Sequence, residues 1–207
     1  MTDINLPLIL LAALLAGASP GPATLTIAGT SMASGRRAGL AVASGVTTGS
    51  FMWSVSAAFG LGAIMLANAW LFEIVRYAGA AYLGWLAIKS ARAAWAGASL
   101  KVPDVSQKSI RGHYAKGLGL HLTNPKAILF FGALYSVGVP PGAPVSALVT
   151  VILAVGALSF TVFHGYAFIF SSGPMIRAYA RAKRMFEAAF AIFFGAAALR
   201  ILTAKLA

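Results

Sequence analysis

The stretch "AGASPGPATL" (Ala16–Leu25) sets two prolines and two glycines in an otherwise unbroken apolar run. Proline lacks a backbone N–H and clashes with the carbonyl one turn back, so it breaks or kinks a helix. A second stretch, "LTNPKA" (Leu122–Ala127), places another proline beside polar residues, again within an apolar run. The sequence therefore predicts two interrupted helices, one at each stretch.

The composition around these stretches is that of a polytopic membrane protein. Hydrophobic residues make up 59% of the 207 residues and charged residues 10%, whereas soluble domains carry roughly 25% charged residues. Residues 127–176 contain no Lys, Arg, Asp or Glu, and one spanning helix needs about 20 apolar residues. The N-terminal stretch "MTDINLPLILL" has an acid where a signal peptide has basic residues, which favours a retained segment.

Charge-poor segments predict an all-α protein with six transmembrane helices. They cover residues 5–34, 38–67, 69–90, 114–138, 143–172 and 184–203. The first segment is too long for one straight helix, in agreement with a break at its prolines. Helices 1 and 4 are the two that the prolines interrupt.

Basic residues gather in three of the five connections between these segments. The connections after the first, third and fifth segments hold 12 of the 16 basic residues: Arg36, Arg37, Lys89, Arg92, Lys101, Lys108, Arg111, Lys116, Arg177, Arg181, Lys183 and Arg184. Basic loops stay in the cytoplasm, so both chain termini should lie outside a bacterial inner membrane. The net charge of +12 is therefore interpreted as a topology signal and not as a nucleic-acid surface.

The two halves of the chain resemble each other. The stretch 96–113 is the only one typical of a linker, and it divides one transmembrane domain (1–207) into repeats of about 1–103 and 104–207. A shift of 103 residues aligns Pro22 with Pro125 and four glycines of the first half with glycines of the second. With three spans each, the repeats would be inverted, as in many secondary transporters.

The paired breaks predict a substrate site. Irregular backbone at membrane depth persists only where protein or a wet cavity satisfies its polar groups. A helix that restarts there points N–H groups and a positive dipole end into the gap. The alternative interpretation is that both prolines only kink their helices for packing.

Three stretches carry a resemblance to a known family: "SPGPATLTIAGTSMASGRRAGLAVASGVTTG", "AGAAYLGWLAIKSAR" and "GLGLHLTNPKAILFF". In these the chain resembles the LysE/RhtB family of bacterial amino-acid exporters. The resemblance implies six spans and proton-driven export of small amino acids. It also implies functional roles for Pro20, Gly21, Pro22, Asn124, Pro125 and Lys126. Members commonly carry Asp or Asn at position 23 and an acid at position 50, where this chain has Ala23 and Ser50.

The expected substrate-binding residues combine these motifs with nearby hydroxyls: Ser19, Pro20, Gly21, Pro22, Thr24, Ser50, Thr123, Asn124, Pro125 and Lys126. Lys126 is the lone cation of the apolar region, where a charge must face a cavity or a partner. It could anchor a substrate carboxylate, or it could snorkel or bind the broken-helix carbonyls of the opposite half.

Protons, no cofactor and no metal are expected. His121 and His164 lie within predicted spans and are the candidate proton carriers. The chain has no cysteine and no catalytic motif, which argues against an enzyme. A metal-ion exporter is the alternative function, although four acids and isolated histidines give few ligands. A non-transporting subunit would not need polar groups such as Asn124.

Two Gly-x3-Gly pairs, Gly35/Gly39 and Gly45/Gly49, allow helices to approach closely. Packing within the chain is the first interpretation and a homodimer the second. The site offers partners for a substrate carboxylate but no carboxylate for a second ammonium group. Neutral substrates such as threonine, homoserine or its lactone, and leucine are therefore expected over lysine or arginine.

Overall fold

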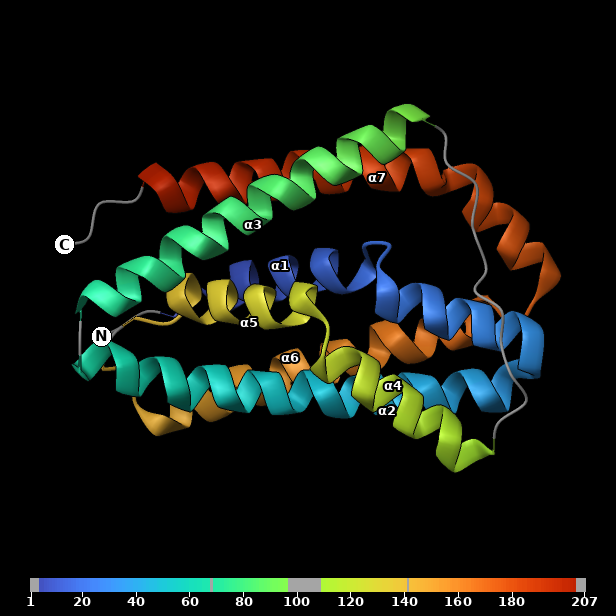
Figure 1. Ribbon diagram of the computed structural model, residues 1–207, viewed down its shortest axis with the longest axis horizontal. Helices are drawn as coiled ribbons and strands as arrows, with labels where there is room; N and C mark the ends of the chain where they lie inside the picture. Colours follow the sequence, from blue (N-terminus) through green and yellow to red (C-terminus); the bar gives the residue numbers. More distant parts are fainter. Residues whose placement is uncertain (1–3, 68, 97–108, 141, 204–207) are drawn as a thin grey trace.

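The computed structural model describes residues 4–67, 69–96, 109–140 and 142–203. These residues form seven α-helices and no strand, which confirms the all-α prediction (Figure 1). The helices are α1 (Leu6–Ala18), α2 (Pro22–Ala67), α3 (Ala69–Ala96), α4 (Ile110–Leu122), α5 (Pro125–Gly138), α6 (Val145–Ile169) and α7 (Gly173–Thr203).

Both predicted breaks are present, and each ends at a proline. Pro22 is the first residue of α2 and Pro125 is the first residue of α5. The first helical position suits proline, because its N–H would be unpaired there and its fixed φ is helical. At the first break, α1 and the helix over Pro22–Gly60 are bent by 52°.

The connection expected after residue 34 is a single residue. Gly35 has φ 82° and ψ 172°, a backbone conformation that side chains rarely adopt, and the chain reverses direction there within α2 (Figure 1). Open space surrounds Gly35, so its role is conformational and the close packing expected of it is not seen. Gly39 does pack closely, since a Cβ there would lie 1.9 Å from the Ser31 hydroxyl oxygen.

Two helices extend beyond the predicted segments. α7 begins at Gly173, ahead of the segment predicted to start at residue 184, and α3 continues to Ala96. The basic residues of these regions therefore extend helices and do not form loops. Most of the predicted linker, residues 97–108, lies outside the described residues.

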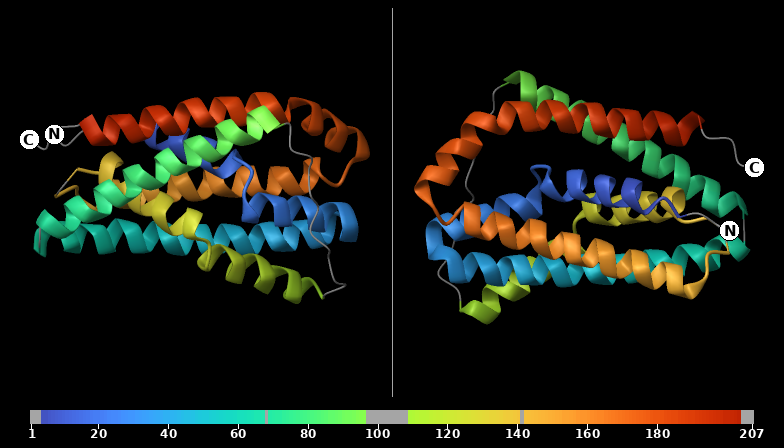
Figure 2. Two further views of the ribbon diagram at one scale, coloured as in Figure 1. Left: turned by 45° about the horizontal axis from the view of Figure 1, so that its top comes forward. Right: turned by 180° about the vertical axis from the view of Figure 1, so that it is seen from behind.

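The helices pack in a crossed bundle that both further views show (Figure 2). α3 and α7 lie side by side along one edge, and α2 packs on α6 along the other. α1 and α5 lie between these edges, with α1 against α6, whereas α4 packs on the outer side of α2 (Figure 1). One core cluster joins Ile9 of α1, Leu83 of α3, Phe131 of α5, Val151 of α6 and Phe194 of α7.

Glycines bring α2 and α4 into backbone contact. A Cβ on Gly45 would lie 2.1 Å from the carbonyl oxygen of Tyr114, and one on Gly117 would lie 2.2 Å from that of Val42. Gly49 faces the side chain of His121. The prediction that the Gly45/Gly49 pair serves packing within the chain is confirmed.

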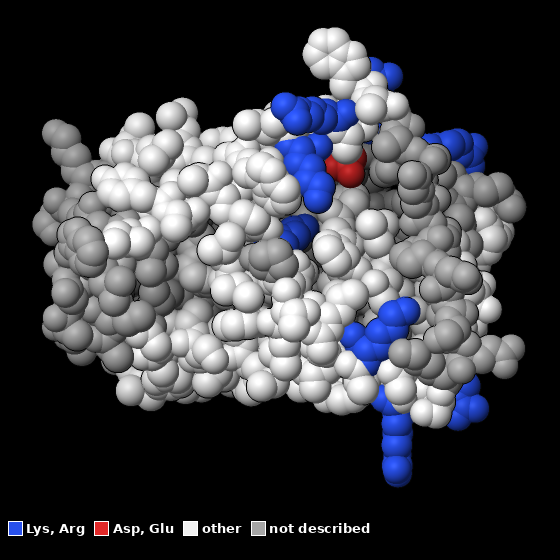
Figure 3. All heavy atoms as spheres, in the orientation of Figure 1, with Lys and Arg blue, Asp and Glu red and all other residues white. Residues whose placement is uncertain are grey.

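The surface is largely apolar. Large hydrophobic side chains such as Leu153, Phe160 and Ile192 are more than half exposed. In Figure 3 the described Lys and Arg side chains lie in the half of the molecule away from the chain termini, with one acidic side chain among them. Within the described residues, α6 is the one helix long and apolar enough to cross a bilayer by itself, and α1 passes the same test together with Pro22–Gly60.

Candidate substrate site

The first helix break is a three-residue gap between α1 and α2. Ser19 caps α1 with an extended backbone (φ −70°, ψ 140°), the conformation favoured before a proline such as Pro20. Its hydroxyl donates to the carbonyl of Ala16 at 2.8 Å. The Gly21 amide donates to the Thr24 hydroxyl at 2.9 Å, so Thr24 caps the start of α2 from within.

A side chain from α6 completes the first break. The Tyr166 hydroxyl donates to the carbonyl of Ala18 at 2.6 Å, 148 residues away in sequence. The break frees this carbonyl from its helical partner, and a buried carbonyl without a partner is destabilising. Nothing local in the sequence marks Tyr166, and the prediction missed it.

The second break is a two-residue gap between α4 and α5. Asn124 precedes the proline with an extended backbone, and its side-chain oxygen accepts from the Lys126 amide at 3.0 Å. The amides of Ala127 and Ile128 donate to the Asn124 carbonyl. Asn124 therefore satisfies the first turn of α5, and these amides are not bare donors as the sequence suggested.

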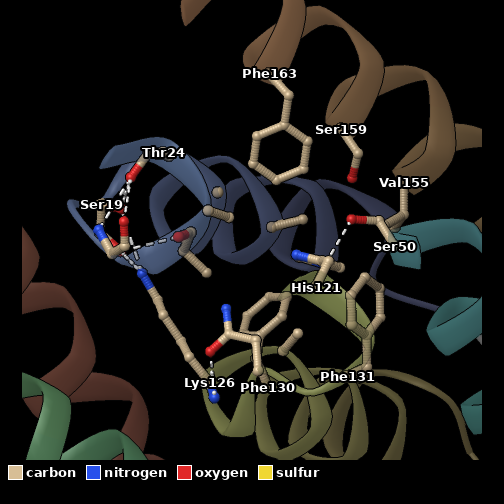
Figure 4. Close-up of a pocket in the computed structure, with 17 residues that line it drawn as sticks. Ser19, Thr24, Ser50, His121, Lys126, Phe130, Phe131, Val155, Ser159 and Phe163 are labelled. Carbon is tan, nitrogen blue, oxygen red and sulfur yellow. Dashed lines mark hydrogen bonds between the residues drawn. The ribbon is translucent and has the colours of Figure 1, made fainter. Parts of the chain in front are cut away.

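Lys126 connects the two breaks. Its ammonium group donates to the Ser19 carbonyl at 3.3 Å and forms a short hydrogen bond with the Ser19 hydroxyl. In Figure 4 the Lys126 side chain extends across the gap from α5 to the Ser19–Thr24 segment. The sequence left several interpretations of Lys126 open. In the structure Lys126 contacts a carbonyl of the broken helix in the opposite half of the chain.

A cavity of about 50 Å³ lies where the breaks meet. Seven of the twelve expected site residues line it: Ser19, Gly21, Thr24, Ser50, His121, Asn124 and Lys126. The sequence did not single out the rest of the lining, which includes the apolar side chains of Phe130, Phe131, Val155 and Phe163 and the hydroxyl of Ser159 (Figure 4). A signal for two of these exists, since Phe130 and Phe131 follow Lys126 by about one helical turn.

His121 and Ser50 form a pair at this cavity. The Ser50 hydroxyl lies 2.9 Å from Nε2 of His121, and the indole N–H of Trp53 donates to the His121 carbonyl at 3.3 Å. His121 is buried, and its Nδ1 has no hydrogen-bond partner among the described residues. One ring nitrogen is thus held by α2 while the other is open to a ligand.

Five expected residues do not line the cavity: Pro20, Pro22, Thr123, Pro125 and His164. Pro22 and Pro125 begin their helices, and the Thr123 hydroxyl donates to the Gly119 carbonyl at 2.9 Å. His164 is engaged elsewhere, with Nε2 3.1 Å from the Ser44 hydroxyl and its ring stacked on Phe160.

Glu187 is the one acidic residue whose side chain the structure describes. It lies on the face of α7 that also carries Phe190 and Phe194, and it is buried. It does not line the cavity. In the described part of the chain, no group of three or more His, Asp or Glu could hold a metal ion.

Interrupted apolar helices that meet at a polar cavity are the architecture of membrane transport proteins. The sequence model of one such family matches residues 14–205, and the chain belongs to this family, the LysE type translocators.

Three relatives illustrate the similarity. The homoserine/homoserine lactone efflux protein of Salmonella typhimurium is 35% identical over 136 residues, which cover 65% of this chain and 65% of the relative. The membrane protein YahN of Escherichia coli is 31% identical over 194 residues, 89% of this chain and 82% of the relative. The threonine efflux protein of Escherichia coli is 28% identical over 180 residues, 86% and 87% of the two chains. No solved structure matches the chain.

Proposed function

We propose that the protein exports small neutral amino acids from the cytoplasm across the bacterial inner membrane, by alternating access of two inverted three-helix repeats. The observation that carries this proposal is the meeting of two helix breaks at a cavity to which both contribute polar residues, joined by Lys126 and Ser19. Relatives named for the efflux of homoserine and threonine support export of amino acids over catalysis.

The packing pattern supports an inverted repeat. If α1 with the start of α2 corresponds to α4 with α5, then the rest of α2 corresponds to α6, and α3 to α7. Under this exchange the contact of α1 with α6 becomes that of α4 with α2, and both contacts are present, the second being the larger. The α2–α6 and α3–α7 contacts each map onto themselves. Such a twofold relation is typical of inverted-repeat transporters.

The charge distribution supports six spans with both termini outside. Arg36, directly after the reversal at Gly35, donates to the Ser171 hydroxyl after α6 at 3.1 Å, so the reversal and the end of α6 share one side. Basic side chains lie in the half of the molecule away from the termini (Figure 3). The positive-inside rule assigns the corresponding end to the cytoplasm. A homodimer stays a prediction of the sequence.

The site chemistry favours a neutral amino acid. Hydroxyls, a freed carbonyl, His121 and Lys126 can pair with one carboxylate and one ammonium group. No carboxylate lines the cavity to pair with a second ammonium group. A bare second charge in a site shielded from water costs several kcal/mol. Threonine, homoserine and leucine therefore fit this site better than lysine and arginine.

Alternating access follows from the cavity size. A volume of about 50 Å³ holds a few water molecules, so the halves must separate before an amino acid can enter. Proton coupling is part of the proposal. His121 is its candidate carrier because it lines the cavity, whereas His164 is bonded elsewhere.

Inside-out membrane vesicles containing the protein test the proposal. Labelled threonine, homoserine and leucine should accumulate when an imposed gradient makes the vesicle interior acidic, and an uncoupler should abolish the accumulation. Excess lysine or arginine should compete poorly. His121→Gln should lose concentrative uptake, and His164→Gln is the matched control. Uptake of none of the three amino acids above that of empty vesicles would overturn the proposed function.

A further inference from the structure

The ammonium group of Lys126 and the α-ammonium group of an amino acid are the same chemical group. Each has three N–H donors and no acceptor, so acceptors that satisfy one satisfy the other. We propose that the Ser19 carbonyl and hydroxyl form the ammonium subsite of the transporter. Lys126 fills this subsite in the closed protein, and the substrate displaces it. This inference rests on the proposed function.

The orientation of Ser19 supports the assignment. Its hydroxyl proton is committed to the Ala16 carbonyl at 2.8 Å, so the oxygen presents only lone pairs to the Lys126 ammonium. The Ser19 carbonyl points to the same nitrogen at 3.3 Å. Ser19 is only 2% exposed, so water does not compete for these acceptors. Two desolvated acceptors converging on one point form a site built for a cation.

Lys126 can leave without movement of the helices. Its backbone is fixed at the start of α5 by Asn124, whereas its four-carbon stem is flexible. A Cβ on Gly21 would lie 3.4 Å from Cδ and 3.3 Å from Nζ of Lys126. Gly21 thus makes room for the stem, and rotation about the stem moves the ammonium away from Ser19 toward the rest of the cavity.

The exchange keeps the charges paired. A zwitterion that binds Ser19 through its ammonium group also brings a carboxylate into the cavity. The released Lys126 ammonium then pairs with this carboxylate. A ligand with an ammonium and no carboxylate would leave two positive charges together. One with a carboxylate and no ammonium would not fill the acceptors of Ser19. The subsite therefore selects molecules that carry both groups.

Lys126→Met tests this exchange with a pair of probes. The probes are whichever of threonine, homoserine and leucine the vesicles export, and the amide of the same amino acid, which keeps the ammonium and lacks the carboxylate. Binding is measured by calorimetry on the purified chain. The native protein should prefer the amino acid. Lys126→Met should bind the amide roughly tenfold more tightly and the amino acid roughly tenfold more weakly, the effect expected of one charge-assisted hydrogen bond.

Two further variants separate the outcomes. Lys116→Met removes a lysine of α4 that does not line the cavity, and it should bind both probes as the native protein does. Ser19→Ala removes an acceptor that the Lys126 ammonium and the substrate ammonium share, so by itself it should change the binding of either probe little. Added to Lys126→Met, or to Lys126→Ala if the methionine variant does not fold, Ser19→Ala should weaken the binding of both probes by the same factor.

Loss of binding of both probes in Lys126→Met, with its melting curve intact, would overturn the subsite, as would unchanged binding when Ser19→Ala is added to the Lys126 variant. Either result leaves the proposed function standing if the native protein still exports an amino acid. Native protein that neither binds nor exports any of the three would overturn the proposed function itself.

Discussion

The two helix breaks solve the same problem with partners from different places. At the second break, Asn124 and Thr123 bond to residues within four positions of themselves. At the first break, Thr24 supplies a local cap and its hydroxyl also lies 3.3 Å from the Ser19 carbonyl oxygen. The freed carbonyl of Ala18 takes its donor from Tyr166, and that of Ser19 takes a further donor from Lys126, both in the other half of the chain.

This difference assigns different mechanical roles to the breaks. We expect the second break to stay intact during transport, because its bonds are either local or made to α2, to which α4 is fixed by glycine contacts. The first break loses donors when α5 or α6 shifts. Segments whose bonds depend on distant elements open at lower free energy than self-contained ones. We infer that the first break rearranges during transport and the second serves as its support.

The largest effect is expected from a substitution that disrupts the contact between α2 and α4. In Gly117→Ala the new methyl group would lie 2.2 Å from the Val42 carbonyl oxygen, so α4 must separate from α2. We expect the free energy of unfolding in detergent to fall by roughly 3 kcal/mol. Gly119→Ala, two residues along the same helix, has open space and is the matched control. Equal stability of the two variants would show that the α2–α4 contact is not the support.

A smaller loss of stability is expected when the first break loses the hydrogen-bond donor that α6 provides. Tyr166→Phe removes the hydrogen bond to the Ala18 carbonyl and leaves the ring in place. We expect a loss of about 1.5 kcal/mol, because a buried carbonyl loses its partner. Hydrogen exchange should rise at the start of α2 and stay unchanged at the start of α5. A rise at both breaks would contradict the separation of roles.

The smallest effect compares the two local caps. Asn124→Ala and Thr24→Ala each remove a side chain that bonds to a backbone amide, and each should cost about 1 kcal/mol. Asn124→Asp and Thr24→Ser keep the acceptor oxygen and should restore stability. Thermal unfolding of the four variants measures this. If removing the cap lowered stability at only one of the two breaks, the breaks would differ in their local hydrogen bonds as well.

The sequence predicted what depends on near neighbours. Proline chemistry located both breaks, and the charge-poor segments located the helices, because both signals act over a few residues. The same local rules placed Asn124 and Lys126 beside a break. They could not say that Lys126 would reach Ser19, 107 residues earlier in the chain.

Tertiary contacts decided the remaining cases. Two histidines looked equivalent in sequence, yet His121 lines the cavity and His164 bonds to Ser44. The one-residue reversal at Gly35 replaced a predicted loop, since a positive φ needs only glycine and no particular neighbours. The aromatic wall is not visible in sequence because phenylalanine is common throughout an apolar chain.

The small volume between the breaks has an electrical consequence. A membrane that stores energy as an ion gradient must not be short-circuited by the proteins embedded in it, and a continuous file of water conducts protons. The cavity has room for only a few water molecules, and the rings of Phe130, Phe131 and Phe163 bound it. We therefore expect the substrate-free chain to conduct few protons, so that a cell keeps many idle copies without discharging its membrane.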